Sequence, residues 1–223
     1  MKIILFLLSF FFLSCGPFSA TLENMDSVPL SAEKAEPAPT ASLSNDMILP
    51  AASRDLIYFN QTDARWAEKN YGPQNRIAAY GCGPTVLSML VSTFTEETIP
   101  PDEMAEWCYE NGFFSQNSGS YHSIIPEGAR AWGLDARSLK DLSYRSMLNE
   151  LYAGRLIVML MGEGHFTSGG HFIIIRNVTL EGDLLIADPN SIDNSLSPWA
   201  YELIRSEIKP SDDAGGPVWS IGK

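Results

Sequence analysis

The sequence contains few cysteines, few histidines and few basic residues for its length. Among 223 residues there are 3 Cys, 3 His and 15 Lys and Arg, against 27 Asp and Glu, which gives a net charge of −12. This shortage of positive charge argues against nucleic acid or an anionic lipid surface as a partner. No cysteine pair has zinc-binding spacing, and neither a His-Glu-x-x-His segment nor a Gly-x-x-x-x-Gly-Lys-Ser/Thr phosphate loop occurs. We therefore expect neither a metal nor another cofactor.

The chain begins with an apolar run that is too short to cross a bilayer. Residues 3–13 are well short of the roughly 20 residues that a membrane-spanning helix needs. With Lys2 before them and small residues after them, they have the pattern of a secretory signal peptide. Phe12-Leu13-Ser14-Cys15 resembles a bacterial lipobox, which implies a lipid on Cys15. We predict a signal peptide over 1–15 and a membrane-anchored lipoprotein outside the cytoplasm, with simple secretion or an uncleaved anchor as alternatives.

The next segment differs in composition from the rest of the chain. Residues 16–53 carry Pro, Ala, Ser and Glu without hydrophobic periodicity, as in Ala35-Glu36-Pro37-Ala38-Pro39-Thr40-Ala41. Such a segment buries too little apolar surface to offset the entropy of ordering, so we predict a disordered tether. Residues 54–223 have the length and the apolar content of one folded domain.

Within this domain, most predicted helices come before most predicted strands. We expect a helix after Cys82, further helices over 101–111, 126–133, 144–153 and 197–208, and strands over 56–59, 156–161, 171–176, 184–187 and 218–221. The run 156–161 is apolar throughout, which predicts a strand buried on both faces. Helices followed by strands predict an α+β fold.

One thiol occurs in a setting that favours its ionised form. In Tyr80-Gly81-Cys82-Gly83-Pro84-Thr85, Pro84 suits the first helical position. Cys82 would then lie at the helix cap, where free N–H groups and the helix dipole lower a thiol pKa. The flanking glycines open the backbone to close approach. The alternative for Cys82 is that it serves only as a small buried hydrophobic residue. That is our interpretation of Cys108. A disulfide between Cys82 and Cys108 is a further alternative that the sequence does not exclude.

A histidine and an aspartate flank two predicted strands. His171 begins the first strand and Asp188 follows the second. A hairpin symmetric about residues 179–180 would place them opposite each other, whereas a turn centred on Glu181-Gly182 would shift the register. A cysteine nucleophile needs a base, and the base needs a group that fixes its tautomer. Cys82, His171 and Asp188 can supply these three roles, although a core histidine and a turn aspartate are the ordinary structural alternatives.

Four motifs together resemble a known family. They are, in chain order, Tyr58-Phe59-Asn60-Gln61-Thr62-Asp63, Gly81-Cys82-Gly83-Pro84-Thr85, Gly169-Gly170-His171-Phe172-Ile173-Ile174 and Asp188-Pro189-Asn190. Over about 56–205 the chain looks like the peptidase-like relatives of bacteriocin-processing, double-glycine leader peptidases, which are papain-like cysteine peptidases. The resemblance implies a papain-like α+β fold, with the helical part first and an antiparallel sheet after it.

The resemblance also implies roles for individual residues. Cys82 would be the nucleophile, His171 the general base and acid, and Asp188 the residue that orients the imidazole. Gln61 would contribute its amide to an oxyanion hole together with the Cys82 N–H, which requires the loop between them to fold back. We expect an extracytoplasmic thiol peptidase that cleaves peptide or other amide bonds through an acyl-enzyme.

The substrate is less constrained than the chemistry. Because the chain lacks the phosphate loop of the transporter-borne leader peptidases, we expect a stand-alone domain whose peptide or protein substrate need not be a double-glycine leader. The membrane would be contacted only through the N-terminal lipid or signal segment. The alternative function is a catalytically silent module that binds a peptide or a cell-wall fragment. The sequence does not predict an oligomeric state.

Two further histidines have no defined role in this scheme. No helix follows the Gly162-x-Gly164 pattern, so we interpret residues 162–170 as a wall or lid of a cleft rather than a phosphate loop. His165 either lines that cleft or is an ordinary loop residue. His122 has no assigned role.

Overall fold

The computed structural model describes residues 47–223. The predicted signal peptide over 1–15, the predicted lipid on Cys15 and the predicted tether up to residue 46 lie outside the described residues. Within residues 47–223, no helix is long and apolar enough to cross a membrane.

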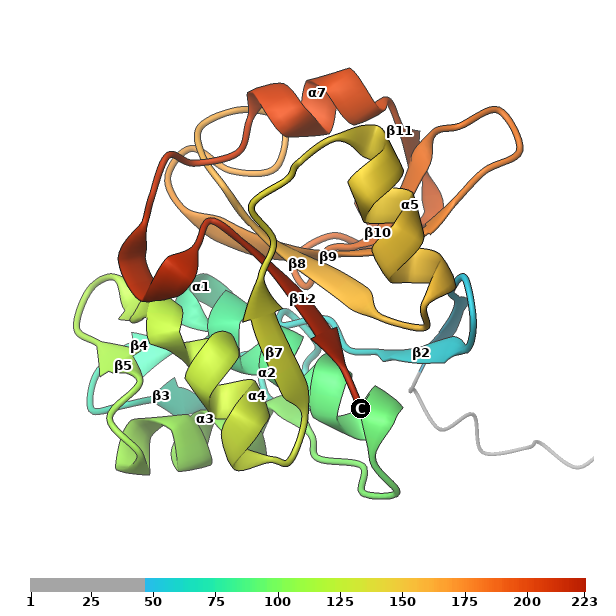
Figure 1. Cartoon of the computed structure of the whole chain (residues 1–223). Helices are drawn as coiled ribbons and strands as arrows, with labels where there is room; N and C mark the ends of the chain where they lie inside the picture. The colour runs from blue at the N-terminus through green and yellow to red at the C-terminus, as the bar shows by residue number, and fades with distance from the viewer. Residues whose placement is uncertain (1–46) are drawn as a thin grey trace, which may run out of the picture. The chain divides into compact units, whose positions relative to one another are not determined.

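A six-stranded antiparallel sheet forms the centre of the fold (Figure 1). Its strands lie in the order β11-β10-β9-β8-β12-β7. Their bounds are β7 Asp135–Ser138, β8 Leu156–Met161, β9 His171–Val178, β10 Leu184–Ala187, β11 Pro198–Trp199 and β12 Val218–Gly222. Every residue of β8 is apolar and buried, which confirms the prediction that this strand is covered on both faces.

Helices cover both faces of this sheet. In Figure 1, α1 to α4 lie on one side of it, and α5 and α7 lie on the other. The bounds are α1 Ile77–Tyr80, α2 Cys82–Phe94, α3 Pro101–Glu110, α4 Pro126–Ala131, α5 Tyr144–Tyr152, α6 Ile192–Leu196 and α7 Tyr201–Ser206. Val158 of β8 belongs to the core cluster that includes Leu87 of α2, while its neighbour Ile157 clusters with Met147 of α5. This division follows from the alternation of side chains along a strand.

A hairpin before the helical part corrects the predicted tether. The small elements of the described residues are β1 Met47–Pro50, β2 Asp55–Tyr58, β3 Asn70–Tyr71, β4 Asn75–Arg76, β5 Phe114–Ser115, β6 Gly119–Ser120 and the short 3₁₀ helices η1 His122–Ile124 and η2 Asp213–Gly215. β1 pairs with β2, and Leu49 of β1 is only 3% exposed and packs in the core. The prediction of a disordered tether was therefore wrong for residues 47–53, because Leu49 is buried and its strand is paired.

The α+β fold confirms the sequence-based prediction, and four predicted helices are present. The helices predicted after Cys82 and over 101–111, 126–133 and 144–153 correspond to α2, α3, α4 and α5. β7 was not predicted; it is the edge strand that pairs with β12, so β12 lies between β8 and β7.

The prediction of a single helix over 197–208 was wrong. The chain forms α6 earlier, then the edge strand β11, and only then the short helix α7. Trp199 pairs with Leu184 of β10, and Ala200 has an extended backbone at the N-cap of α7. Pairing with the sheet therefore replaces the first turn of the predicted helix.

Candidate active site

Cys82 is the first residue of α2. Gly81 is the N-cap, so Pro84 is the third helical residue rather than the first, and the predicted helix start was wrong by two positions. The first backbone hydrogen bond of the helix runs from Thr85 N–H to the Gly81 carbonyl oxygen at 2.9 Å. Pro84 precedes that donor, so its missing N–H leaves no helical hydrogen bond unmade. The thiol is thus placed at the N-terminal end of a 13-residue helix.

The glycines on either side of Cys82 are required by close packing. A Cβ atom at Gly81 would lie 2.5 Å from the Ile77 carbonyl oxygen, and one at Gly83 would lie 2.5 Å from Ser120 Oγ. Both distances are shorter than any normal contact of a Cβ atom with a non-bonded neighbour. A larger residue at Gly81 would meet the Ile77 backbone and displace the segment that carries the thiol, whereas one at Gly83 would first displace the Ser120 side chain.

The surroundings of the Cys82 thiol favour a thiolate. Burial by itself would raise the pKa of Cys82, but the hydrogen bond and charge of His171 outweigh burial and lower that pKa below its ordinary value. The backbone N–H groups of Phe172 and Gly83 add to this effect. Gly83 belongs to the first turn of α2, where the helix dipole also favours negative charge.

His171 connects Cys82 to Asp188. His171 Nε2 lies 2.7 Å from Asp188 Oδ1, and both residues are buried. Burial by itself would lower the pKa of His171, but the hydrogen bonds with Asp188 and with Cys82 raise it to about 10. Since Nε2 is engaged by Asp188, Nδ1 is the nitrogen left for Cys82. The arrangement therefore favours a thiolate–imidazolium pair.

His171 and Asp188 do not face each other across the β9–β10 ladder, because the register agrees with the alternative turn near Glu181-Gly182 rather than with the hairpin symmetric about 179–180. The last ladder pair is Ala187 with Ile174, and a β-bulge between residues 185 and 186 shifts the register. Asp188 lies just beyond β10, where the chain turns. The two side chains meet at this end of the sheet without being direct cross-strand neighbours.

A hydrogen-bond network fixes the Asp188 carboxylate. Oδ1 also accepts the Asn190 N–H at 2.9 Å, and Oδ2 accepts from Asn194 Nδ2 at 2.8 Å. The hydroxyl of Tyr58 donates to the Asp188 carbonyl oxygen at 2.7 Å. Because both carboxylate oxygens and the backbone carbonyl are engaged, the protein sets the orientation of the carboxylate toward His171.

Gln61 lies between the segment that precedes Cys82 and the segment that follows Asp188. Its Nε2 donates to the Ala78 carbonyl oxygen at 2.8 Å, and its backbone N–H donates to the Pro189 carbonyl oxygen at 2.7 Å. The loop between Gln61 and Cys82 therefore folds back, as expected. Within the described residues, the buried Oε1 of Gln61 has no hydrogen-bond partner. Nε2 carries a second N–H that the Ala78 contact does not use.

A cleft of about 130 Å³ opens beside Cys82. The other residues that line it are Ser118, Ser120, His122, Leu160, Gly170, Phe172 and Lys209. Sequence reasoning gave His122 no role, yet the fold brings it to this cleft. Its ring lies edge-on to that of Phe172 with 6.0 Å between the centroids, and its Nδ1 lies 3.2 Å from Ser211 Oγ. No local signal identifies His122, because long-range packing alone places its loop here.

His165 does not line this cleft. Its backbone N–H donates to Glu207 Oε2 at 2.8 Å, and its Nδ1 contacts the other oxygen of the same carboxylate. Its ring lies edge-on to Trp199, with 6.2 Å between the centroids. Of the two interpretations of His165, the structure favours the ordinary loop residue.

Cys108 is a core residue, as predicted. It is fully buried in the cluster that packs α2 and α3 together, and burial raises the pKa of its thiol. Cys82 and Cys108 are both free thiols. Cys108 therefore provides an unactivated internal reference for the reactivity of Cys82.

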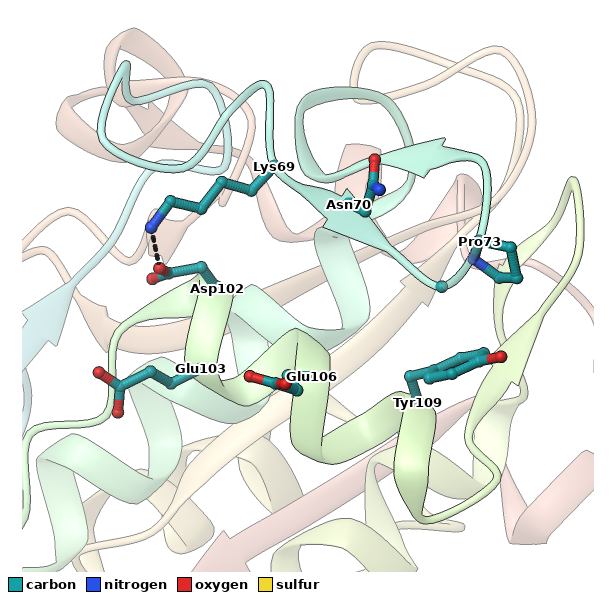
Figure 2. Close-up of a pocket in the computed structure, with 8 residues that line it drawn as sticks. Lys69, Asn70, Pro73, Asp102, Glu103, Glu106 and Tyr109 are labelled. Carbon is teal, nitrogen blue, oxygen red and sulfur yellow. Dashed lines mark hydrogen bonds and ion pairs between the residues drawn. The ribbon is translucent and has the colours of Figure 1, made fainter.

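A larger hollow of about 520 Å³ lies between the β3–β4 hairpin and α3 (Figure 2). It is lined by Lys69, Asn70, Gly72, Pro73, Asp102, Glu103, Glu106 and Tyr109. Lys69 forms an ion pair with Asp102 across it. Within residues 47–223, no group of three or more His, Cys, Asp or Glu side chains is arranged to hold a metal ion. This hollow contains no nucleophile paired with a base, so the smaller cleft is the candidate active site.

Comparison with known proteins identifies the family. The model of the Peptidase_C39 like family matches residues 54–209, a range that contains Gln61, Cys82, His171 and Asp188. The chain belongs to this family. The resemblance to the double-glycine leader-peptidase-like proteins is thereby confirmed, and so is the papain-like α+β fold.

Solved structures include a similar protein. A crystal structure from Bacillus anthracis, assigned to the C39-like peptidases, is 14% identical in sequence and has a TM-score of 0.48. The alignment covers 80% of this chain and 98% of that chain. No curated protein matches the chain. Membership of the family therefore rests on the match of the family model.

Proposed function

We propose that this protein is a cysteine peptidase that cleaves peptide or closely related amide bonds. One observation carries the proposal: the imidazole of His171 hydrogen bonds to Cys82 on one side and to Asp188 on the other. A base in contact with a nucleophile on one side and an orienting group on the other is the arrangement that covalent acyl transfer requires. Family membership supports the same class of reaction.

In the proposed reaction, the Cys82 thiolate attacks the scissile carbonyl carbon. As the tetrahedral intermediate collapses, the C–N bond breaks and His171 gives its proton to the leaving amine. A water molecule then donates a proton to His171 and attacks the thioester carbonyl. The C–S bond breaks, the acid product leaves, and the thiolate–imidazolium pair is regenerated. Asp188 holds the His171 ring in one orientation throughout.

Stabilisation of the oxyanion would come from two donors. The backbone N–H of Cys82 lies in the first turn of α2, where no helical acceptor is available to it. The second amide proton of Gln61 Nε2 would be the other donor, while the bond to Ala78 holds the side chain in place. Gln61 thus acts in the proposal as an electrostatic group rather than as a base.

The proposal also includes a location outside the cytoplasm. It rests on the signal-peptide pattern over 1–15 and on the lipobox-like residues that end at Cys15. Metabolic labelling with a radioactive fatty acid tests it. Label that is present in the wild-type protein and absent from Cys15→Ser supports lipidation.

A peptide-library screen tests the proposed activity. The purified protein is incubated with a mixed peptide pool, and new peptide ends are read by mass spectrometry. Cleavage by the wild type and by Cys108→Ala, with none by Cys82→Ala, is the expected result. Cleavage that survives in Cys82→Ala contradicts the proposal. Binding of peptides without cleavage by the wild type favours the silent binding module instead.

A further inference from the structure

A lysine without an ionic partner lines the cleft that contains Cys82. Lys209 lines it together with Ser118, Ser120 and His122. Within residues 47–223, no hydrogen bond or ion pair involves the Lys209 ammonium group. The protein as a whole has a net charge of −12, so a cation in this cleft gives the cleft a charge opposite in sign to that of the whole protein.

Backbone hydrogen bonds hold Lys209 in this position. The Lys209 N–H donates to the Leu160 carbonyl oxygen at 2.9 Å, and the Gly162 N–H donates to the Glu207 carbonyl oxygen at 2.7 Å. Between them, Ile208 forms a β-bridge with Met161 at the end of β8. The segment 207–209 therefore extends the sheet along the edge of β8 that faces β12, opposite β9, and the lysine does not project from a free tail.

The ammonium group passes beside the residue that precedes His171. A Cβ atom at Gly170 would lie 3.2 Å from Lys209 Nζ. Because Gly170 has no side chain, nothing at this position separates the ammonium from the cleft. Lys209 thus presents a positive charge beside Gly170, the residue before the proposed catalytic base, in the cleft that Cys82 also lines.

Two acidic residues close to Lys209 in the sequence, Glu207 and Asp213, each contact a histidine. Asp213 Oδ2 lies 3.5 Å from His122 Nδ1, and Glu207 is bound to His165. Burial lowers the pKa of His122, and the charge of Lys209 lowers it further, while Asp213 acts in the opposite direction. His122 is therefore mainly neutral near neutral pH, and Lys209 supplies the positive charge of this cleft.

We propose that Lys209 binds a substrate carboxylate, so that the preferred substrates carry one next to the scissile bond. The inference rests on the proposed peptidase function and adds the class of substrate. At about 130 Å³ the cleft is much smaller than the roughly 300–1,000 Å³ of sites for drug-sized ligands, so it suits one short group. The Ser118 hydroxyl can donate a further hydrogen bond to the carboxylate, and so can the Ser120 hydroxyl when Tyr71 is the donor of the 2.8 Å hydrogen bond between them. An acidic side chain and a free C-terminal carboxylate share this chemistry.

Alkylation with two matched reagents tests the site without requiring turnover. Iodoacetate and iodoacetamide differ only in that the first carries a carboxylate. The ratio of their rates at Cys82 reports carboxylate binding, because any change in thiolate fraction cancels. Lys209→Gln should lower this ratio about tenfold, which is the size of one charged hydrogen bond. Lys209→Arg should retain most of it, and Arg205→Gln, an exposed basic residue on α7, should leave it unchanged.

An unchanged ratio in Lys209→Gln overturns the proposal, and so does an equal fall in Arg205→Gln.

Peptide substrates then separate the two sources of the carboxylate. If the side chain is bound, Lys209→Gln lowers kcat/KM about tenfold for acidic peptides whether or not their C-terminus is amidated. If the terminal carboxylate is bound, amidation removes the effect. Equal kcat/KM values for acidic and neutral peptides, free or amidated, contradict the inference. A protein that turns over no peptide but keeps the alkylation ratio refutes the peptidase proposal alone.

Discussion

His171 Nε2 is bonded to Asp188 Oδ1 at 2.7 Å, which commits the opposite ring nitrogen to Cys82. This single contact fixes which way the imidazole faces. It also explains why the pKa of His171 is raised although the ring is buried, since the protonated ring can donate to Asp188 and to the Cys82 sulfur at once. The predictions below follow from this pairing.

Removing the carboxylate should disable the imidazole. Asp188→Ala is expected to lower kcat/KM by about 100-fold or more, the usual contribution of a positioned general acid–base. The pKa of His171 should fall as well, because burial then acts without its main opposing contact. The pH–rate profile of the variant measures both effects. A variant with unchanged kcat/KM and an unchanged basic limb contradicts this role for Asp188.

The reactivity of Cys82 should depend on pH as part of a coupled pair. The lowered pKa of Cys82 predicts that iodoacetamide labelling is already fast below the roughly 8.5 at which a free thiol ionises. In His171→Ala, the effect of burial on the Cys82 pKa is no longer offset by the imidazole. The pH at which labelling becomes fast should therefore rise. Turnover in the wild type should fall as the pH passes about 10, because His171 then has no proton for the leaving amine. Slow labelling of Cys82 at neutral pH, equal to that of Cys108, contradicts the thiolate–imidazolium pair.

Gln61 should matter for turnover but not for alkylation. Gln61→Ala is expected to lower kcat by about 100- to 1,000-fold if its amide stabilises the oxyanion. Alkylation of Cys82 by iodoacetamide forms no oxyanion, so its rate should stay near that of the wild type. If both rates fall together, Gln61 serves mainly to tie Ala78 to Pro189, and the oxyanion role is rejected.

The β1–β2 hairpin should belong to the folded domain. Leu49→Ala is expected to lower the free energy of unfolding by about 2–4 kcal/mol, because the buried side chain leaves a cavity in the core. Ile48→Ala, on the exposed neighbour, should change it by less than about 0.5 kcal/mol. Denaturant unfolding compares the two variants. Equal effects would mean that the strand contributes no core packing.

Elements with strong local signals could be predicted from the sequence. Pro101 and Pro126 each begin a helix that was predicted, and Ser143 caps the third by accepting the Ser146 N–H. The apolar run of β8 was also sufficient by itself to predict a strand that is buried on both faces. In each case the deciding interaction lies within a few residues of the signal.

Elements defined by distant partners could not be predicted. β11 has two residues and exists because Trp199 pairs with Leu184. The hairpin turns about residue 181 rather than about 179–180, and a bulge between residues 185 and 186 then shifts the register by one, so Asp188 lies two ladder positions from the one expected opposite His171. The cleft positions of His122 and Lys209 depend on loops from separate parts of the chain, which only the folded structure brings together.

The central claim is that Cys82 carries an acyl group during turnover. Rapid acid quenching of the protein with a cleaved peptide, followed by mass spectrometry of its proteolytic fragments, tests this directly. The account predicts a mass increase equal to the acyl part of the substrate on the fragment containing Cys82, and neither this adduct nor product with Cys82→Ala. Product formation without any adduct on Cys82, or at the wild-type rate in Cys82→Ala, would contradict it.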